Sequence, residues 1–356
     1  MKKIWCIALA LPLAGCMNHN MDSTQPKLAI TYPAAYVVNG ESNSLSVIDL
    51  SSQQVRETIV LGNPSMSHSG SAMSGMIMWP HHISLSPNGS RLSIGVPGMD
   101  LSGGHAGGMA GMKGRLVVLD SQNGETLKNQ ELPAMNHNAA FSPDGTELWT
   151  TSMQDAGKVL VYDANTYQLK KEIPVGKQPA EVTFTADGQF AFVANGEESS
   201  VSVVRVTDKI VVKTIPVGED PVGAWPGADG KMYVDNEKGQ SISVIDPASL
   251  RVVETLPLGF TPGYAAYNSV TNELWVSQAG SGNKVVIFGR SGGAWRQSAE
   301  IVTGLDAHAI AFSKDGLTAY VTNQGAATVS ILDTKNRTKI KDVAVGKKPN
   351  GIVLKF

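Results

Sequence analysis

The sequence predicts an all-β fold, and within that class a seven-bladed β-propeller closed by the C-terminal strand. A unit of about 40 residues recurs along the chain, and each unit contains four short runs of alternating or β-branched residues separated by turn residues. Repetition at this period is typical of sheets arranged radially around an axis. The repeats therefore replace the two-domain organisation that 356 residues alone would suggest.

The repeat is clearest when residues 179–218 are aligned with residues 307–346. The third runs of the seven units end at Asp49, Asp120, Asp163, Arg205, Asp246, Gly289 and Asp333. Successive ends are 41–44 residues apart, except for the 71 residues between the first two. Two packed β-sandwiches, the alternative architecture, do not explain this constant spacing. We therefore expect one domain over residues 28–356.

The two ends of this domain predict how the ring closes. Residues 35–39 (AYVVN) match the second run of a unit and have no first run before them. Residues 349–356 (PNGIVLKF) match a first run and have no second run after them. We expect the C-terminal strand to complete the first blade, because this pairing hides two sheet edges.

A short motif in the second runs carries a family resemblance. Residues 320–323 spell YVTN, and residues 36–39, 192–195 and 233–236 are variants of it. The chain resembles the YVTN-family β-propeller repeat lipoproteins, within the wider group of nitrous-oxide-reductase-like propellers. This resemblance implies the fold, but it implies no particular activity because propellers host many.

The first residues predict export and a lipid anchor. Two lysines precede an apolar run that ends at Ala14 and is too short to span a membrane, so residues 1–15 match a signal peptide. Leu13-Ala14-Gly15-Cys16 resembles the bacterial lipoprotein box. It implies lipidation of Cys16, residues 16–27 as a tether, and a periplasm-facing place in the envelope. Met17 after the cysteine favours the outer membrane, whereas an ordinary signal peptide with an incidental cysteine is the alternative.

Composition and motifs exclude several classes of function. The net charge of −2 becomes −4 without Lys2 and Lys3, and no basic run remains, so we expect no nucleic acid partner. Neither of the two cysteines lies in residues 28–356, which excludes a disulfide and a covalent c-type haem there. No P-loop, G-x-S-x-G, H-E-x-x-H or EF-hand motif occurs. The sequence predicts no catalytic residue and favours a binding protein.

The long interval in the repeat reflects two insertions in blade 2, residues 65–79 and 97–113. One precedes the first run of the blade and the other joins its second and third runs, so alternating strand direction predicts both on one face beside the channel mouth. The insertions are rich in methionine and histidine, and their candidate ligands are His68, Met73, Met76, Met78, His105, Met109 and Met112. Methionine also packs adaptably, which is the structural alternative.

Three first runs carry a histidine in the same register. His81, His137 and His308 each lie eight residues before the glycine of the following turn, and Asn350 holds this place in blade 1. Ring order makes these four residues a contiguous arc at the channel mouth. His82 and Glu181 each lie one residue inside this ring position, where either could carry a proton or pack between blades. Trp225 is expected to pack between blades.

These observations predict a copper site. Imidazole is the commonest transition-metal ligand, and thioethers nearby favour copper, above all Cu(I). We expect His81, His137 and His308 to bind the ion, with His82, His105, His68 and the insertion methionines as further ligands or a capture surface. Each histidine could instead simply form hydrogen bonds in a polar channel.

Three functions remain open from the sequence. The first is an envelope lipoprotein that stores, delivers or detoxifies copper or uses it in a redox step; the site is similar in kind to the histidine-ligated copper cluster of nitrous oxide reductase. That family has more histidines and an added copper domain, so nitrous oxide reduction is not expected. The second is a metal-free scaffold that grips another envelope protein. The third is a tetrapyrrole-binding propeller with one axial histidine.

Overall fold

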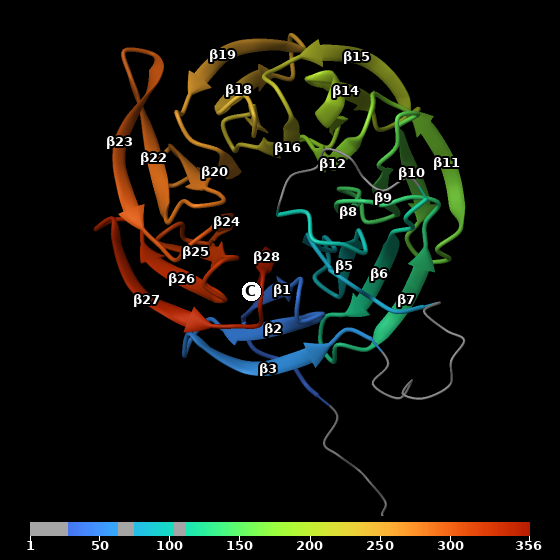
Figure 1. The fold of residues 1–356 in the computed structure, drawn as a ribbon, viewed down its shortest axis with the longest axis horizontal. Helices are drawn as coiled ribbons and strands as arrows, with labels where there is room; N and C mark the ends of the chain where they lie inside the picture. Colours follow the sequence, from blue (N-terminus) through green and yellow to red (C-terminus); the bar gives the residue numbers. More distant parts are fainter. Residues whose placement is uncertain (1–27, 63–74, 103–110) are drawn as a thin grey trace, which may run out of the picture.

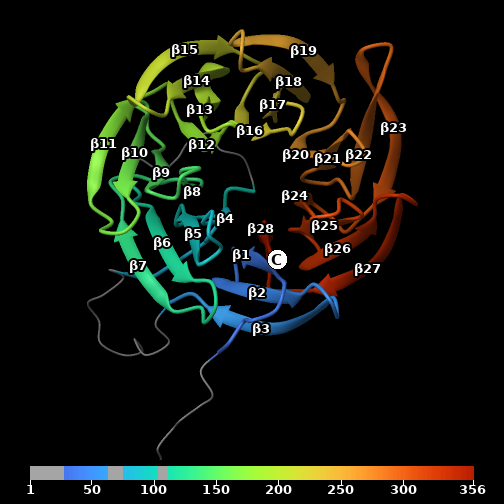
Figure 2. The same ribbon diagram turned by 180° about the vertical axis from the view of Figure 1, so that it is seen from behind.

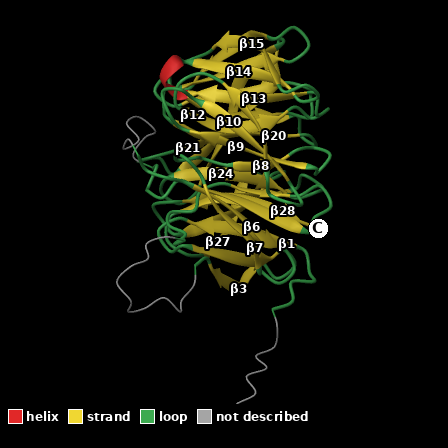
Figure 3. Ribbon diagram, turned by 90° about the vertical axis from the view of Figure 1, so that its right-hand side faces the viewer, coloured by secondary structure: helices red, strands yellow, loops and turns green. Residues whose placement is uncertain are grey.

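The computed structural model describes residues 28–62, 75–102 and 111–356, which form a ring of seven four-stranded antiparallel sheets (Figures 1 and 2). The only helix within these residues is the three-residue 3₁₀ turn Gly196–Glu198. From the side, the strands run through the thickness of the ring and loops gather at its two faces (Figure 3). The predicted fold class is confirmed.

Each blade contributes one strand to the central channel, and its other three strands lie progressively farther from the axis. From blade 1 to blade 7, the innermost strands are β28 (Pro349–Lys355), β4 (Ile83–Leu85), β8 (Ala139–Phe141), β12 (Pro179–Phe184), β16 (Pro221–Pro226), β20 (Pro262–Asn268) and β24 (Ala307–Phe312). In the same order, the second strands are β1 (Ala34–Asn39), β5 (Arg91–Val96), β9 (Glu147–Ser152), β13 (Phe190–Asn195), β17 (Met232–Asn236), β21 (Glu273–Gln278) and β25 (Thr318–Asn323).

The two outer positions complete each sheet. The third strands are β2 (Ser44–Asp49), β6 (Arg115–Asp120), β10 (Lys158–Asp163), β14 (Ser200–Arg205), β18 (Ser241–Asp246), β22 (Lys284–Ser291) and β26 (Thr328–Asp333). The outermost are β3 (Gln54–Val60), β7 (Thr126–Glu131), β11 (Leu169–Pro174), β15 (Ile210–Pro216), β19 (Arg251–Pro257), β23 (Ala294–Val302) and β27 (Thr338–Ala344). Six third strands end at the residues expected from the repeat; β22 continues past Gly289 into a long hairpin with β23.

The ring closes as the sequence predicts. Strand β28 pairs with β1 in antiparallel register, with Ala34 opposite Lys355 and Tyr36 opposite Val353. The hydroxyl of Tyr36 also donates a hydrogen bond to the carbonyl oxygen of Ser121 in blade 2. The first and last sheets of the chain are thereby one blade, and that blade is tied to its neighbour.

The apolar core lies between neighbouring blades. Strand β2 is buried along its whole length, because it is covered by a blade on each face, whereas β3 at the rim alternates between exposed and half-buried residues. No helix in the described part of the chain has the length and apolar character needed to cross a membrane.

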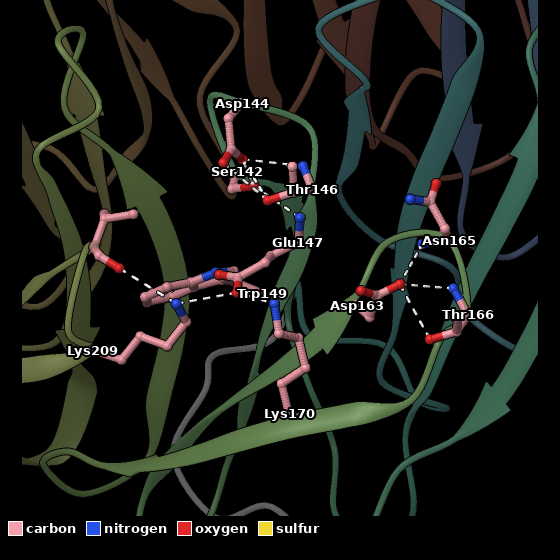
Figure 4. Close-up of polar contacts among 11 residues, drawn as sticks. Ser142, Asp144, Thr146, Glu147, Trp149, Asp163, Asn165, Thr166, Lys170 and Lys209 are labelled. Atoms are coloured by element: carbon pink, nitrogen blue, oxygen red, sulfur yellow. Dashed lines mark hydrogen bonds and ion pairs between the residues drawn. The ribbon is translucent and has the colours of Figure 1, made fainter.

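Charged side chains reinforce some of the blade contacts. The buried carboxylate of Glu147 in blade 3 accepts hydrogen bonds from Trp149 and Lys170 and pairs with Lys209 of blade 4 at 3.1 Å (Figure 4). Burial opposes ionisation of Glu147, but these donors outweigh it and lower the pKa of the carboxyl group. Asp144 and Asp163, also in Figure 4, accept hydrogen bonds from the residues that follow them and so fix the turns around them.

Candidate metal centre

Two consecutive histidines enter the channel because the innermost strand of blade 2 starts with a bulge. The amide of His81 donates to the carbonyl oxygen of Gly95 at 2.8 Å, and the amide of Gly95 donates to the carbonyl oxygen of His82 at 3.1 Å. His81 and His82 therefore face a single residue of β5, the arrangement that re-aims side chains in β-bulges. Regular pairing begins only at Ile83.

The same irregularity recurs around the ring. The register of the innermost strand shifts between Pro179 and Val182 and between Ala307 and Ile310, at the positions of Glu181 and His308. The channel ends of the strands are thus built from residues that leave the regular ladder. This repeated feature brings side chains from both the ring position and the next position toward the axis.

Four imidazoles meet at this end of the channel. The ring centroid of His81 lies 4.7 Å from that of His82 and 4.2 Å from that of His137. His308 lies farther away, with its centroid 5.4 Å from His82 and 5.8 Å from His81. All four side chains belong to buried residues.

Three of these histidines have the spacing of a metal-binding group. Ligand nitrogens of His81, His82 and His137 lie within 4.8 Å of one another. Nitrogens bound to one tetrahedral ion at 2.0–2.1 Å stand about 3.3 Å apart, so small side-chain rotations would be enough to close them around an ion. The structure therefore brings together the four channel histidines, and it places His82 within the tightest group and His308 at its border.

Glu181 connects two of the imidazoles. Its Oε1 atom lies 3.1 Å from Nε2 of His82 and 2.9 Å from Nδ1 of His137, and its Oε2 atom accepts a hydrogen bond from Asn138. Burial, and next the charge of Asp235, raise the pKa of Glu181 well above its usual value. A carboxylate in this place is suited to orienting imidazoles around an ion.

A cavity of about 350 Å³ adjoins the histidines and is lined by the innermost strands of all seven blades. Its wall is mainly apolar, with Ile83, Phe141 and Phe184 among its members, and His82 and Glu181 are its members from the histidine cluster. A small molecule in this cavity would contact His82 and Glu181, whereas the other three channel histidines do not line the cavity.

An aromatic pair forms one side of the cavity. The rings of Trp225 and Tyr264 lie 3.9 Å apart, and Trp225 donates a hydrogen bond from Nε1 to the buried Asp235 at 2.6 Å. The expectation that Trp225 packs between blades is thus incomplete, because the same side chain also faces the channel. Burial, and next the charge of Glu237, raise the pKa of Asp235 well above its usual value.

The described ends of the second insertion lie over the predicted arc. Leu101 is buried, and Lys348, the residue before β28, donates to the hydroxyl of Ser102 at 2.9 Å. Met99 and Met112, at the two ends of the insertion, pack against Leu101, Met135 and Met153. The segment after β5 therefore reaches from blade 3 to blade 1 on the histidine side of the ring.

The described end of the first insertion takes a different path. The carbonyl oxygen of Gly75 accepts a hydrogen bond from Asn129 on the outermost strand β7, Met76 is 51% exposed, and Ile77 is buried between blades 1 and 2. This described end therefore starts at the rim. Met76 is thus exposed next to a residue that contacts the rim, and Met78 is half-buried.

Several predicted site residues lie outside the described residues. They are Cys16, His68, Met73, His105 and Met109, together with the signal peptide and the tether. Trp225 and Tyr264 are the channel residues whose role sequence reasoning missed. Glu181 was expected as a proton carrier or as packing, but not as a contact of two imidazoles. Glu181 and Tyr264 each lie one residue after the histidine register, and this spacing was the signal available in the sequence. It could not show that a bulge presents both the register position and the next residue to the axis.

Comparisons with known proteins match the fold. No protein-family model matches the chain, and no curated protein matches its sequence. The periplasmic gluconolactonase PpgL of Pseudomonas aeruginosa is similar in structure, with a TM-score of 0.69, 20% identity, and coverage of 90% of this chain and 98% of that chain. Hydrazine synthase of Kuenenia stuttgartiensis gives a TM-score of 0.63 at 20% identity, covering 82% of this chain and 92% of that chain.

A third solved structure is a complex with a small molecule. The dihydro-heme d1 dehydrogenase NirN in complex with DHE gives a TM-score of 0.60 at 14% identity, covering 90% of this chain and 74% of that chain. Identities this low show a shared propeller fold, and the activities of these proteins differ from one another.

Proposed function

We propose that this propeller binds one copper ion at the channel end through His81, His82 and His137, with His308 as a fourth ligand. The observation that carries the proposal is the buried group of three imidazoles with ligand atoms within 4.8 Å of one another. Neutral imidazole ligates through a ring nitrogen, and a buried cluster of such rings suits a transition metal better than a hard cation that prefers oxygen.

Glu181 supports this function by holding two ligands. Hydrogen bonding of a carboxylate to a ligating imidazole fixes the orientation of the ring and raises its basicity. A bound cation would in turn stabilise the ionised carboxylate, which burial alone disfavours. The contacts of Glu181 with His82 and His137 are thus favourable when an ion is bound. Without the ion, the ionised carboxylate is costly because it is buried.

Methionines on the same face favour copper over zinc, because thioethers are soft ligands. We infer a copper-binding protein of the cell envelope, anchored through a lipid on Cys16, that stores, delivers or detoxifies the ion. The cavity beside His82 would give a redox reaction at the ion room for a small molecule. A tetrapyrrole is less well supported, since of the four histidines only His82 lines the cavity.

Elemental analysis of the purified protein, produced in a copper-supplemented periplasm, tests the proposal. We expect one copper bound at the histidines, and its loss in His81→Ala and His137→Ala, each with a greater effect than the ~10–100-fold typical of losing an outer-shell partner. Ser202→Ala, a buried polar substitution in blade 4, is the matched control. Unchanged copper content in the triple variant lacking His81, His82 and His137 would overturn the site, and a Soret absorption band would show a tetrapyrrole protein instead.

A further inference from the structure

A methionine cluster on the histidine side of the ring has a composition unlike the rest of the core. Met135 and Met153 are buried with Leu101, and Met99 and Met112 pack against them. The other seven apolar clusters of the described residues contain a single methionine, Met232. Aliphatic and aromatic side chains fill those clusters, so packing alone does not require thioethers at this place.

Three separate segments converge to form the cluster. Met135 precedes the innermost strand of blade 3, and its carbonyl oxygen accepts a hydrogen bond from the amide of Met153, which follows β9. Met99 and Met112 come from the two ends of the second insertion. These ends meet, because a Cβ on Gly98 would lie 3.5 Å from the carbonyl oxygen of Lys113 and 3.8 Å from the Met112 methyl group.

We propose that Met99, Met112, Met135 and Met153 form a second, thioether-based site that takes Cu(I). Thioether sulfur is a soft and neutral ligand that selects Cu(I) over Zn(II), Mg(II) or Ca(II). A neutral ligand set in a largely buried place holds a monovalent ion at a lower desolvation cost than a divalent one. The flexible methionine side chains can adjust to the ion without moving the backbone.

The charges around the cluster are compatible with a cation. Lys113 pairs with Glu131 at 2.6 Å, and Lys348 lies 3.8 Å from Asp100. The lysines that flank the second insertion are therefore each compensated by a carboxylate. No net repulsion from them opposes a single positive charge on the sulfur atoms.

The position of the cluster gives it a function with respect to the histidines. Met135 and His137 are separated by one residue in the same segment, and the described ends of the insertion lie on this side of the ring. Cu(I) captured by the thioethers would lie beside the imidazole cluster and could pass to it by ligand exchange. This hand-over rests on the proposed histidine site, whereas the thioether site itself does not.

Anaerobic Cu(I) titration against a chromophoric chelator separates the two sites. The test variant replaces all four methionines by leucine, which conserves volume and is tolerated in cores. Met232→Leu is the matched control, since Met232 is buried between blades 4 and 5, far from the insertions. We expect two Cu(I) in the wild type and the control, and one in the four-leucine variant.

The outcomes are distinguishable. Equal Cu(I) stoichiometry and affinity in the wild type and the four-leucine variant would overturn the thioether site. Loss of one ion in that variant, with no loss in the triple histidine variant, would uphold the thioether site and overturn the proposed function. If the four-leucine variant loses its cooperative thermal unfolding, X-ray absorption of the wild type decides: Cu–S scattering supports the inference, and nitrogen-only coordination refutes it.

Discussion

Gly95 lies directly against the backbone of His137. A Cβ atom on residue 95 would come within 2.5 Å of the carbonyl oxygen of His137, closer than any real contact of this kind. The segments that carry His81 and His137 can approach each other only because position 95 has no side chain.

Gly95→Ala should therefore separate the histidines. We expect a loss of about 1–3 kcal/mol in the free energy of unfolding, as for other overpacked cores, and a weaker copper site because His137 must shift. Gly289→Ala is the control, since a Cβ there would meet no atom closer than 3.9 Å. Chemical denaturation and copper titration measure both effects; equal behaviour of the two variants would contradict the close-approach argument.

Glu181→Gln tests the carboxylate that contacts His82 and His137. Glutamine keeps the shape of the side chain but cannot carry the negative charge that orients and polarises two imidazoles. We expect copper affinity to fall by ~10–100-fold while the fold persists. A copper affinity equal to that of the wild type, measured by chelator competition, would show that Glu181 only packs.

Copper binding should depend on pH in two steps. Imidazole must be neutral to ligate, so affinity at the histidines should weaken as the pH falls through the ordinary histidine range near 6.5. Thioethers do not take up protons there, so Cu(I) on the methionine cluster should survive at pH 5. Titration of the wild type at both pH values checks this, and loss of all Cu(I) at pH 5 would be the contrary result.

Asp235→Asn should change how stability depends on pH. The pKa of Asp235 is raised in the folded state by burial and by Glu237. The contribution of this group to the free energy of unfolding is therefore fully present below the unfolded pKa, and it is lost as the pH rises through the folded pKa. Between these values the wild type should lose about 1.4 kcal/mol per pH unit from this group, and the variant should not.

A group with the opposite shift provides the control. The pKa of Glu147 is lowered, so its contribution is present above the unfolded pKa and is lost as the pH falls through the folded pKa. Glu147→Gln should therefore destabilise the protein at pH 7 and converge with the wild type in acid. Urea unfolding from pH 8 down to well below the ordinary glutamate pKa of about 4.3 measures both curves, and parallel curves for wild type and Asp235→Asn would exclude the assigned role of Asp235.

Cys16→Ser tests the predicted anchor. Without a thiol to acylate, the protein should move from the membrane fraction to the soluble periplasm. Fractionation of cells that express the wild type and the variant measures this. Membrane association that survives the substitution would mean that the protein is held by something other than a lipid at Cys16.

The sequence was sufficient to predict the architecture because each blade repeats similar turn residues at a similar spacing. The spacing of Asp120, Asp163 and Asp246 located the ends of their strands to the residue. Only the β22–β23 hairpin departs from this, since it extends beyond the repeat. The pattern at 35–39 and 349–356 was enough to predict ring closure, because an unpaired second run needs an unpaired first run.

The candidate site was predictable in part. The shared register located His81, His137 and His308 at one end of the channel. A register, however, assigns only one residue of each strand to that position. The bulge opposite Gly95 adds His82 to the tight group and leaves His308 at its edge, and a bulge has no mark in the hydrophobic pattern. The contact of Glu181 with two imidazoles joins blades 2, 3 and 4, so it depends on tertiary packing that no local pattern encodes.

The pairing of β28 with β1 joins residues from opposite ends of the described chain, so we expect it to be a late step in folding. The strand that docks in this step carries Gly351, whose Cβ would lie 2.9 Å from the Cα of His82, so it also forms the support of the histidine cluster. The proposed metal site is therefore complete only once β28 has paired with β1.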